Sequence, residues 1–204
     1  MENLNSLRTY LSAVSTLVSE ISEEELGEMV ELFWEAYQQR ARLVFCGNGG
    51  SAATASHLVA DFQKNIYLAG GRPWEVLALT DSTPLITAWS NDTEYANVFA
   101  GQARCWVRPG DLLVAISGSG NSPNVIAAVE AANEIGATTL AFAGYGGGKL
   151  AKTAKKSFVL HSRNMQHVED AHMIIGHAIY CEIRDRLHRE AVLHAATEAA
   201  RSAL

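Results

Sequence analysis

The sequence predicts an α/β fold, a doubly wound parallel five-stranded sheet flanked by helices. Two observations support this fold class. Short apolar runs alternate with helical patterns along most of the chain, and this alternation is typical of parallel βαβ units. Loops rich in Gly and Ser follow two of the apolar runs, at the strand ends where such sheets bind ligands. We expect residues 1–204 to form one domain with an N-terminal helical arm.

Two helical patterns precede the first expected strand and predict this arm. The first covers residues 4–20 and the second residues 23–40. Ser22 and Glu25 have the spacing of a capping box at the start of the second helix. Apolar side chains then recur on one face of that helix. We expect residues 1–40 to contribute to oligomerisation, and packing on the same domain is the alternative.

The remaining elements follow in the order of a doubly wound sheet. Apolar runs predict strands at residues 42–46, 74–79, 111–116, 138–142 and 157–160. Helical patterns occupy residues 51–64, 83–90, 94–106, 123–135 and 166–187. Pro at the start and Gly after the end delimit the helix at 123–135. The Ala-rich tail at 189–204 is expected either to extend the last helix or to fray.

The composition excludes several classes of function. The formal net charge is −6 and no Lys/Arg cluster occurs, which argues against nucleic acid as a ligand. No apolar run is long enough to span a membrane. The first residues lack the basic and apolar segments of a signal peptide. Three widely spaced cysteines predict no disulfide framework. We therefore expect a cytoplasmic protein.

The segment 116–123, Ile-Ser-Gly-Ser-Gly-Asn-Ser-Pro, is the most informative stretch of the chain. It joins a buried strand to a helix that begins at Pro123. Glycines allow close approach of the backbone, hydroxyls donate hydrogen bonds, and the helix N-terminus attracts anions. Ser122 alone would suffice as a helix cap. The additional Ser117 and Ser119 favour a phosphate-binding loop.

A second glycine loop, Gly47-Asn48-Gly49-Gly50-Ser51, follows the first expected strand. It lacks the spacing of a dinucleotide fingerprint, and no P-loop Lys-Ser/Thr follows it. Because both loops follow parallel strands, we expect them to lie on the same edge of the sheet. The helix after this loop carries His57 and Asp61 on one face. The last helix carries Glu169 and His177, which could both reach a point between them.

Five motifs in this order resemble the sugar isomerase (SIS) domain family. They are G-N-G-G-S at 47–51, H-x-x-x-D at 57–61, S-N-D at 90–92, I-S-x-S-G-N-S at 116–122 and E-x-x-H-x-x-x-x-H at 169–177. The resemblance covers about residues 5–187 and is nearest to the phosphoheptose isomerase branch. That branch converts sedoheptulose 7-phosphate to D-glycero-D-manno-heptose 7-phosphate through an enediol. The resemblance also implies a homotetramer with sites at subunit interfaces.

The resemblance implies a role for each matching position. Ser117, Gly118, Ser119 and Ser122 would hold the phosphate, and the sugar would meet Asn48, Gly49, Gly50, Ser51, Asn91, Asp92, and also Asp61 and Glu169. One zinc ion would be bound by His57, Asp61, Glu169 and His177. Asp61 would act as the catalytic base and His177 as the acid.

Three positions depart from the family pattern and leave alternatives open. Asp61 stands where a glutamate is usual, Glu169 where a glutamine is usual, and Gly118 where a threonine is usual. One alternative is an isomerase of another sugar phosphate in a specialised pathway. Another is a non-catalytic SIS adaptor that binds the replication initiator DnaA. A sugar-phosphate sensor that regulates transcription is the least favoured, because no helix-turn-helix segment precedes residue 40.

Overall fold

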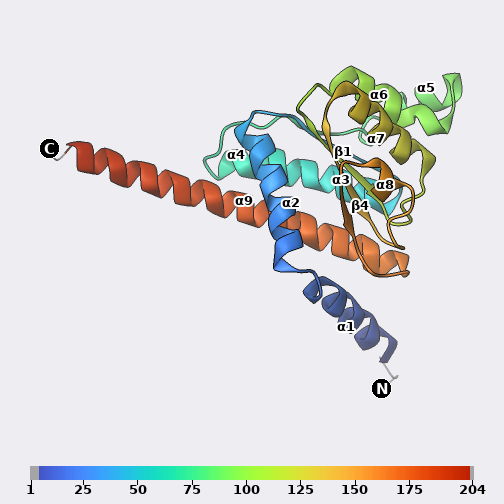
Figure 1. Ribbon diagram of the computed structural model, residues 1–204, viewed down its shortest axis with the longest axis horizontal. Helices are drawn as coiled ribbons and strands as arrows, with labels where there is room; N and C mark the ends of the chain where they lie inside the picture. Colours follow the sequence, from blue (N-terminus) through green and yellow to red (C-terminus); the bar gives the residue numbers. More distant parts are fainter. Residues whose placement is uncertain (1–4, 203–204) are drawn as a thin grey trace.

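The computed structural model describes residues 5–202 and contains a parallel sheet with helices on both faces (Figure 1). The sheet order is β2-β1-β3-β4-β5, and every neighbouring pair is parallel. This arrangement confirms the predicted fold class. The chain leaves β1 toward β2 and then crosses to β3 on the other side of β1, so the switch point lies between β1 and β3. The strands are β1 Leu43–Gly47, β2 Val76–Ala78, β3 Leu112–Ser117, β4 Thr138–Ala143 and β5 Lys156–Val159.

The helices agree with the sequence patterns except near residue 60 and at the C-terminal end. The predicted helix at 51–64 becomes α3, a π-helical turn η1 and the short α4. The tail extends the last helix instead of fraying. Residues 1–4 of the expected arm and residues 203–204 of the tail lie outside the described residues. The bounds are α1 Asn5–Ser19, α2 Glu23–Gln38, α3 Gly50–Val59, η1 Ala60–Asn65, α4 Ile66–Leu68, α5 Thr83–Asp92, η2 Tyr95–Asn97, α6 Val98–Trp106, α7 Pro123–Ile135, α8 Leu150–Thr153 and α9 Met165–Ser202.

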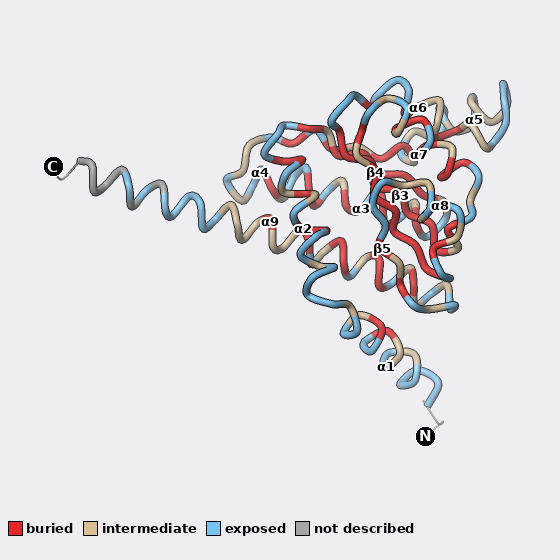
Figure 2. The backbone as a smooth tube through the Cα atoms, in the orientation of Figure 1, coloured by how far each residue is buried: buried red, intermediate tan, exposed pale blue. Residues whose placement is uncertain are grey.

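The sheet is buried on both faces, which explains why its strands read as continuous apolar runs (Figure 2). Successive side chains of a strand point to opposite faces. In β3, Leu112, Val114 and Ile116 belong to the core layer shared with α2, α3 and α9. Leu113 and Ala115 belong to the layer formed with α6 and α7. The two layers hold the loops at the strand ends in fixed positions.

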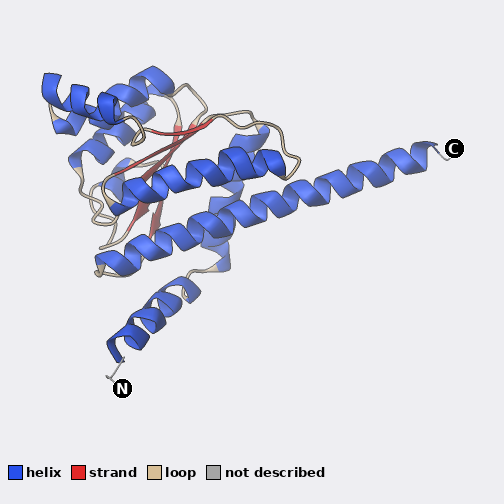
Figure 3. Cartoon of the chain, turned by 180° about the vertical axis from the view of Figure 1, so that it is seen from behind, coloured by secondary structure: helices blue, strands red, loops and turns tan. Residues whose placement is uncertain are grey.

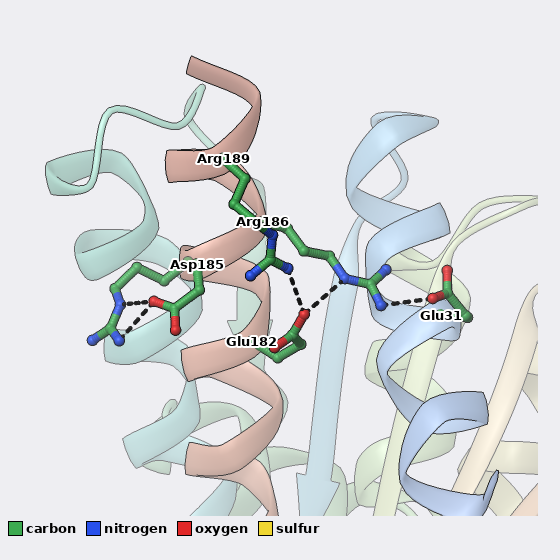
Figure 4. Close-up of polar contacts among 6 residues, drawn as sticks. Glu31, Glu182, Asp185, Arg186 and Arg189 are labelled. Atoms are coloured by element: carbon green, nitrogen blue, oxygen red, sulfur yellow. Dashed lines mark hydrogen bonds and ion pairs between the residues drawn. The ribbon is translucent and has the colours of Figure 1, made fainter. Parts of the chain in front are cut away.

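Helix α9 has 38 residues and is therefore about 57 Å long. Its first half packs against α1, α2 and α3, whereas its second half, in which residues 188–193 are exposed, extends away from the sheet (Figures 2 and 3). Arg186 ties it to α2 through an ion pair with Glu31, with Nη2 and Oε1 2.7 Å apart (Figure 4). Such exposed pairs stabilise by only about 0.2–1 kcal/mol. No helix in residues 5–202 is both long and apolar enough to cross a membrane.

The two helices of the N-terminal arm both pack on the same chain: α2 contributes Met29, Phe33 and Tyr37 to the core, and α1 is held by buried Val14 and Leu17 and by Tyr10. The Tyr10 hydroxyl donates a hydrogen bond to Asp170 Oδ2 at 2.5 Å, and its ring meets that of His167 edge-on. Few side chains of α1 are buried, and Leu7 and Leu11 are exposed. The capping box of Ser22 and Glu25 at the start of α2 is present as predicted. A role of the arm in oligomerisation remains a prediction.

Gly176 allows α9 to lie close to α3. A Cβ atom at this position would lie 2.6 Å from Leu58 Cδ2, and Leu58 is buried. We expect Gly176→Leu to lower the free energy of unfolding by about 3 kcal/mol, because overpacking forces the helices apart. Urea denaturation measures this change. Gly27→Leu is the matched control, since nothing lies within 4 Å of a Cβ there. Equal stability of the two variants would contradict the expectation.

His172 is fully buried on α9 against Phe142. Burial, partly offset by the nearby backbone of Ala143, lowers the pKa of His172 to about 4. The unfolded chain therefore binds the proton more readily than the folded chain. His172 therefore leaves the free energy of unfolding unchanged above pH about 6.5 and lowers it by about 3 kcal/mol in total as the pH falls toward 4. We expect His172→Phe to flatten this dependence in urea denaturation between pH 7 and 4. An unchanged slope would refute the role of His172.

Candidate functional site

A pocket of about 240 Å³ lies at the carboxyl edge of the sheet, at the switch point between β1 and β3. Gly47 at the end of β1 pairs with Ile116 of β3, so the loops that follow these strands meet. The two glycine loops therefore share one edge, as the sequence predicted. The lining residues are Asn48, Gly49, Gly50, Ser51, Ile116, Ser117, Gly118, Ser119, Ser122, Met165 and Glu169.

Two helix N-termini border this pocket. Helix α3 begins at Gly50 and α7 begins at Pro123, and no side chain caps either helix. Ser122 occupies the cap position of α7, but its Oγ lies 3.1 Å from Ser117 Oγ instead of bonding the helix backbone. The hydroxyls and helix ends therefore face a common space. Such an arrangement attracts an anion, because helix N-termini carry partial positive charge and free N–H groups.

The shape of the loop after β3 depends on Gly118 and Gly120. A Cβ atom at Gly118 would lie 2.4 Å from the sulfur of Met165, which stands at the start of α9. A side chain at 118 is therefore excluded while Met165 keeps this position. Gly120 has a left-handed φ of 65°, which favours glycine. The departure at 118 that the sequence revealed is thus coupled to a residue from another part of the chain.

Asn48 links the two loops through its side chain. It exchanges two amide hydrogen bonds with Asn124 of α7, at 2.8 and 2.9 Å. The Tyr95 hydroxyl also donates to Asn48 Oδ1 at 2.9 Å. These bonds occupy the Asn48 oxygen and leave one amide N–H to face a ligand. Sequence reasoning missed Asn124 and Tyr95, because neither belongs to a motif that carries chemistry.

A second group of polar side chains lies between α3 and α9. It consists of His57 on α3, Asp61 in η1 and His177 on α9, whose ligand-type atoms all lie within 4.8 Å of one another. The two Nε2 atoms are 2.8 Å apart. Asp61 Oδ2 is 3.5 Å from His57 Nε2 and 3.4 Å from His177 Nε2. The structure therefore brings together three residues that the sequence singled out on separate helices.

Asp61 is the buried member of this group, at 9% exposure. Asn65 donates a hydrogen bond to its Oδ1 at 2.9 Å, whereas Oδ2 has no partner within the described chain. The π-helical turn Ala60–Asn65 surrounds it, and such turns often mark functional sites. A buried carboxylate oxygen without a partner is costly. It is therefore expected to meet a ligand or an ion.

The group fits a metal ion. Two imidazoles and a carboxylate are the donors that zinc prefers. Ligands at usual zinc distances around a tetrahedral ion are about 3.3 Å from one another, close to the separations of 2.8, 3.4 and 3.5 Å found here. A second observation, which does not depend on the residue types, also indicates a bound ion: the buried Asp61 Oδ2 has no hydrogen-bond partner in the described chain.

One of the four expected zinc ligands, Glu169, lies outside this group, and the expected sugar contacts Asn91 and Asp92 lie outside both the group and the loop pocket. Glu169 lines the loop pocket, and its carboxylate rests against Gly50, so that a Cβ atom there would be 2.4 Å from Glu169 Cδ. The helical spacing between Glu169 and His177 is about 12 Å along α9. Asn91 donates to Asp92 Oδ1 at 2.9 Å on the exposed end of α5. Neither of these two residues lines the pocket of this chain.

Comparisons with known proteins agree on one family. The SIS domain profile matches residues 9–144. A phosphoheptose isomerase of Nitratidesulfovibrio vulgaris is 41% identical over 174 residues, 84% of this chain and 83% of the relative. Another from Aquifex aeolicus is 31% identical over 92% of this chain and 97% of the relative.

A solved structure gives the same result in three dimensions. The phosphoheptose isomerase of Neisseria gonorrhoeae has a TM-score of 0.82 and 30% identity, covering 89% of this chain and 98% of that one. The parallel sheet and the loops at its switch point are thus those of a known architecture. The profile match and the extent of these similarities show that the chain belongs to the SIS domain family, together with the phosphoheptose isomerases.

Proposed function

We propose that this protein is an aldose–ketose isomerase that converts sedoheptulose 7-phosphate to D-glycero-D-manno-heptose 7-phosphate. The observation that carries the proposal is the unpartnered oxygen of buried Asp61 between the two histidines. An isomerase needs a base and an acid close together, beside a site that holds the phosphate. The relatives named as phosphoheptose isomerases support this substrate.

The substrate would extend from the loop pocket to the histidine pair. Ser117, Ser119 and Ser122 and the backbone at Gly118 would bind the phosphate, assisted by the N-terminus of α7. Ser51 at the pocket and His57 lie on the same helix, about 9 Å apart along its axis. This separation suits a sugar whose phosphate and carbonyl group are at opposite ends of an extended chain.

The residues between the two ends would contact the sugar hydroxyls. Asn48 offers one amide N–H, and Gly49, Gly50 and Ser51 offer backbone and hydroxyl groups. Glu169 presents a carboxylate, which accepts hydrogen bonds from hydroxyl groups. Asn91 and Asp92 could take part only in a site formed with a second subunit, because they lie outside the pocket of this chain.

Asp61 and His177 divide the proton transfers. Asp61 accepts the proton from the carbon beside the carbonyl group, and His177 donates a proton to the carbonyl oxygen. The enediol forms, and the proton is returned to the neighbouring carbon. The two side chains approach to 3.4 Å, so they can serve adjacent atoms of one substrate. His57 lies close enough to both to orient them.

A zinc ion is the cofactor that the donor set favours, held by His57, Asp61 and His177. When bound, zinc would polarise the carbonyl group and stabilise the negative charge of the enediolate, in place of proton donation by His177, because a ring nitrogen that binds zinc carries no proton. Glu169 is omitted from this ligand set, because it lies against Gly50 in the loop pocket.

We also propose a homotetrameric assembly in the cytoplasm, with residues 1–204 as a single SIS domain. Leu7 and Leu11 on α1 and Val192 and Leu193 on α9 are exposed, which suits contact with other subunits. All three cysteines are free, as is usual in a reducing compartment.

Removal of the proposed base or the proposed acid should strongly lower the turnover rate. We expect Asp61→Asn and His177→Gln each to lower kcat by about 10²–10⁴-fold with sedoheptulose 7-phosphate. NMR detection of the aldose product measures the rate, and circular dichroism verifies folding. Asp185→Asn is the matched control, because that carboxylate lies on α9 and pairs only with Arg184 among the described residues. Turnover within tenfold of the parent in folded Asp61→Asn would refute the assignment.

Measuring the zinc content of variants tests whether Glu169 is a zinc ligand. After dialysis against metal-free buffer, we expect about one zinc per chain in the parent and in Glu169→Gln, measured by atomic emission. His57→Ala should lose most of the metal, because it removes one of three donors. Loss of zinc from Glu169→Gln would place Glu169 among the ligands. Retention of zinc by His57→Ala would exclude the proposed group.

A further inference from the structure

A second polar pocket, of about 340 Å³, lies at the edge of the sheet opposite the two glycine loops. The turn after α2, the starts of β1 and β2 and the loop before β3 form it. Its position follows from the parallel sheet, since all strands begin at this edge. The lining residues are Gln39, Arg40, Ala41, Arg42, Glu75, Arg108, Pro109, Gly110 and Asp111.

The two acidic side chains of this pocket already have partners. Asp111 accepts hydrogen bonds from the backbone N–H groups of Arg42 and Arg108, both at 2.8 Å. Glu75 Oε2 accepts from Arg42 Nε at 2.6 Å, and Arg42 Nη1 donates to the Trp106 carbonyl at 2.6 Å. Asp111 thus fixes the backbone of the pocket, and Glu75 neutralises one guanidinium.

The other two arginines have no such counterion. Arg40 and Arg108 are exposed, and neither forms an ion pair with any residue of the described chain. A further guanidinium, Arg72, lies above the ring of Tyr37 at 4.0 Å. Burial lowers the pKa of Arg72, and the positive charge of Arg40 lowers it further. The pocket therefore holds two guanidinium groups that no carboxylate of the described chain neutralises, although the whole chain has a net charge of −6.

The backbone conformation of Arg40 is also unusual. Its φ is 58°, in the left-handed region, at the position after the α2 cap where glycine is usually found. The turn is that of a helix end, in which Arg40 N–H donates to the Tyr37 carbonyl at 3.1 Å and Ala41 N–H to the Ala36 carbonyl at 2.9 Å. It turns the chain between α2 and β1 at the point where the Arg40 side chain borders the pocket.

We propose that this pocket is a second anion site, in which Arg40 and Arg108 bind a small metabolite that carries a phosphate or diphosphate group. The planar donors of guanidinium groups match phosphate oxygens in pairs. The pocket is too limited in charge and extent for a nucleic acid backbone, which needs a continuous basic surface. This site is separate from the loop pocket and does not depend on the proposed isomerase activity.

The test titrates the full chain with inorganic pyrophosphate and follows the ¹⁵N-labelled backbone amides of Gly110 and Gly120. Gly110 lies in the arginine pocket and Gly120 in the loop after β3, so each signal reports one site. We expect the Gly110 signal to shift and saturate. Arg40→Asn, which tolerates a left-handed φ, and Arg108→Gln should each weaken this Kd at least about tenfold. The response of Gly120 should stay unchanged.

Arg104→Gln is the control for loss of one charge, because Arg104 is exposed, pairs with Glu134 and does not line the pocket. It should leave the Gly110 response intact. The proposal is overturned if the Gly110 signal does not saturate, or if Arg40→Asn binds pyrophosphate as tightly as the parent. Thermal unfolding shows whether each variant is folded. If Arg108→Gln does not fold, the result for Arg40→Asn decides the test.

Discussion

The close contact between α3 and α9 is the constraint on which the group of His57, Asp61 and His177 depends. Gly176 packs against Leu58 with no room for a side chain. The neighbours of these two residues in sequence are His177 and His57, whose Nε2 atoms are 2.8 Å apart. The absence of a Cβ at one position therefore determines the distance between two functional groups on different helices. The same helix also places Met165 and Glu169 at the loop pocket.

The site combines two kinds of electrostatic environment along one edge of the sheet. The loop pocket attracts an anion through hydroxyls and helix ends that carry no full charge. The group around Asp61 instead has a buried carboxylate and two half-exposed imidazoles. Ser51 and Asp61 lie about three helical turns apart along α3 and η1, and Glu169 is the one carboxylate among the residues that line the loop pocket. The arginine pocket at the other edge uses full charges instead.

The three departures from the family pattern lie at close contacts or at irregular backbone in the structure. At Gly118, the Met165 sulfur occupies the space that a side chain would need, so a larger residue there requires Met165 to move. Glu169 lies against Gly50, where a Cβ atom would meet its carboxylate. Asp61 lies in a π-helical turn, which is wider than a regular α-helical turn. These departures are thus coupled to close contacts or backbone geometry and are not isolated replacements. Each also changes the surface that a sugar would meet, so they bear on substrate identity.

The sequence by itself determined the fold class, the order of elements and the meeting of two glycine loops at one edge. These follow from local periodicity, from turn chemistry and from the rule that parallel strands end together. It also singled out His57, Asp61 and His177, because each stands in a polar pattern on an otherwise apolar helix. The tertiary structure alone decided which of these residues meet. His57 and His177 are 120 positions apart, and their contact depends on helix packing that no local pattern encodes. The same packing placed Glu169 with the loop pocket and revealed the link through Asn124, since long-range contacts depend on the shape of the whole core.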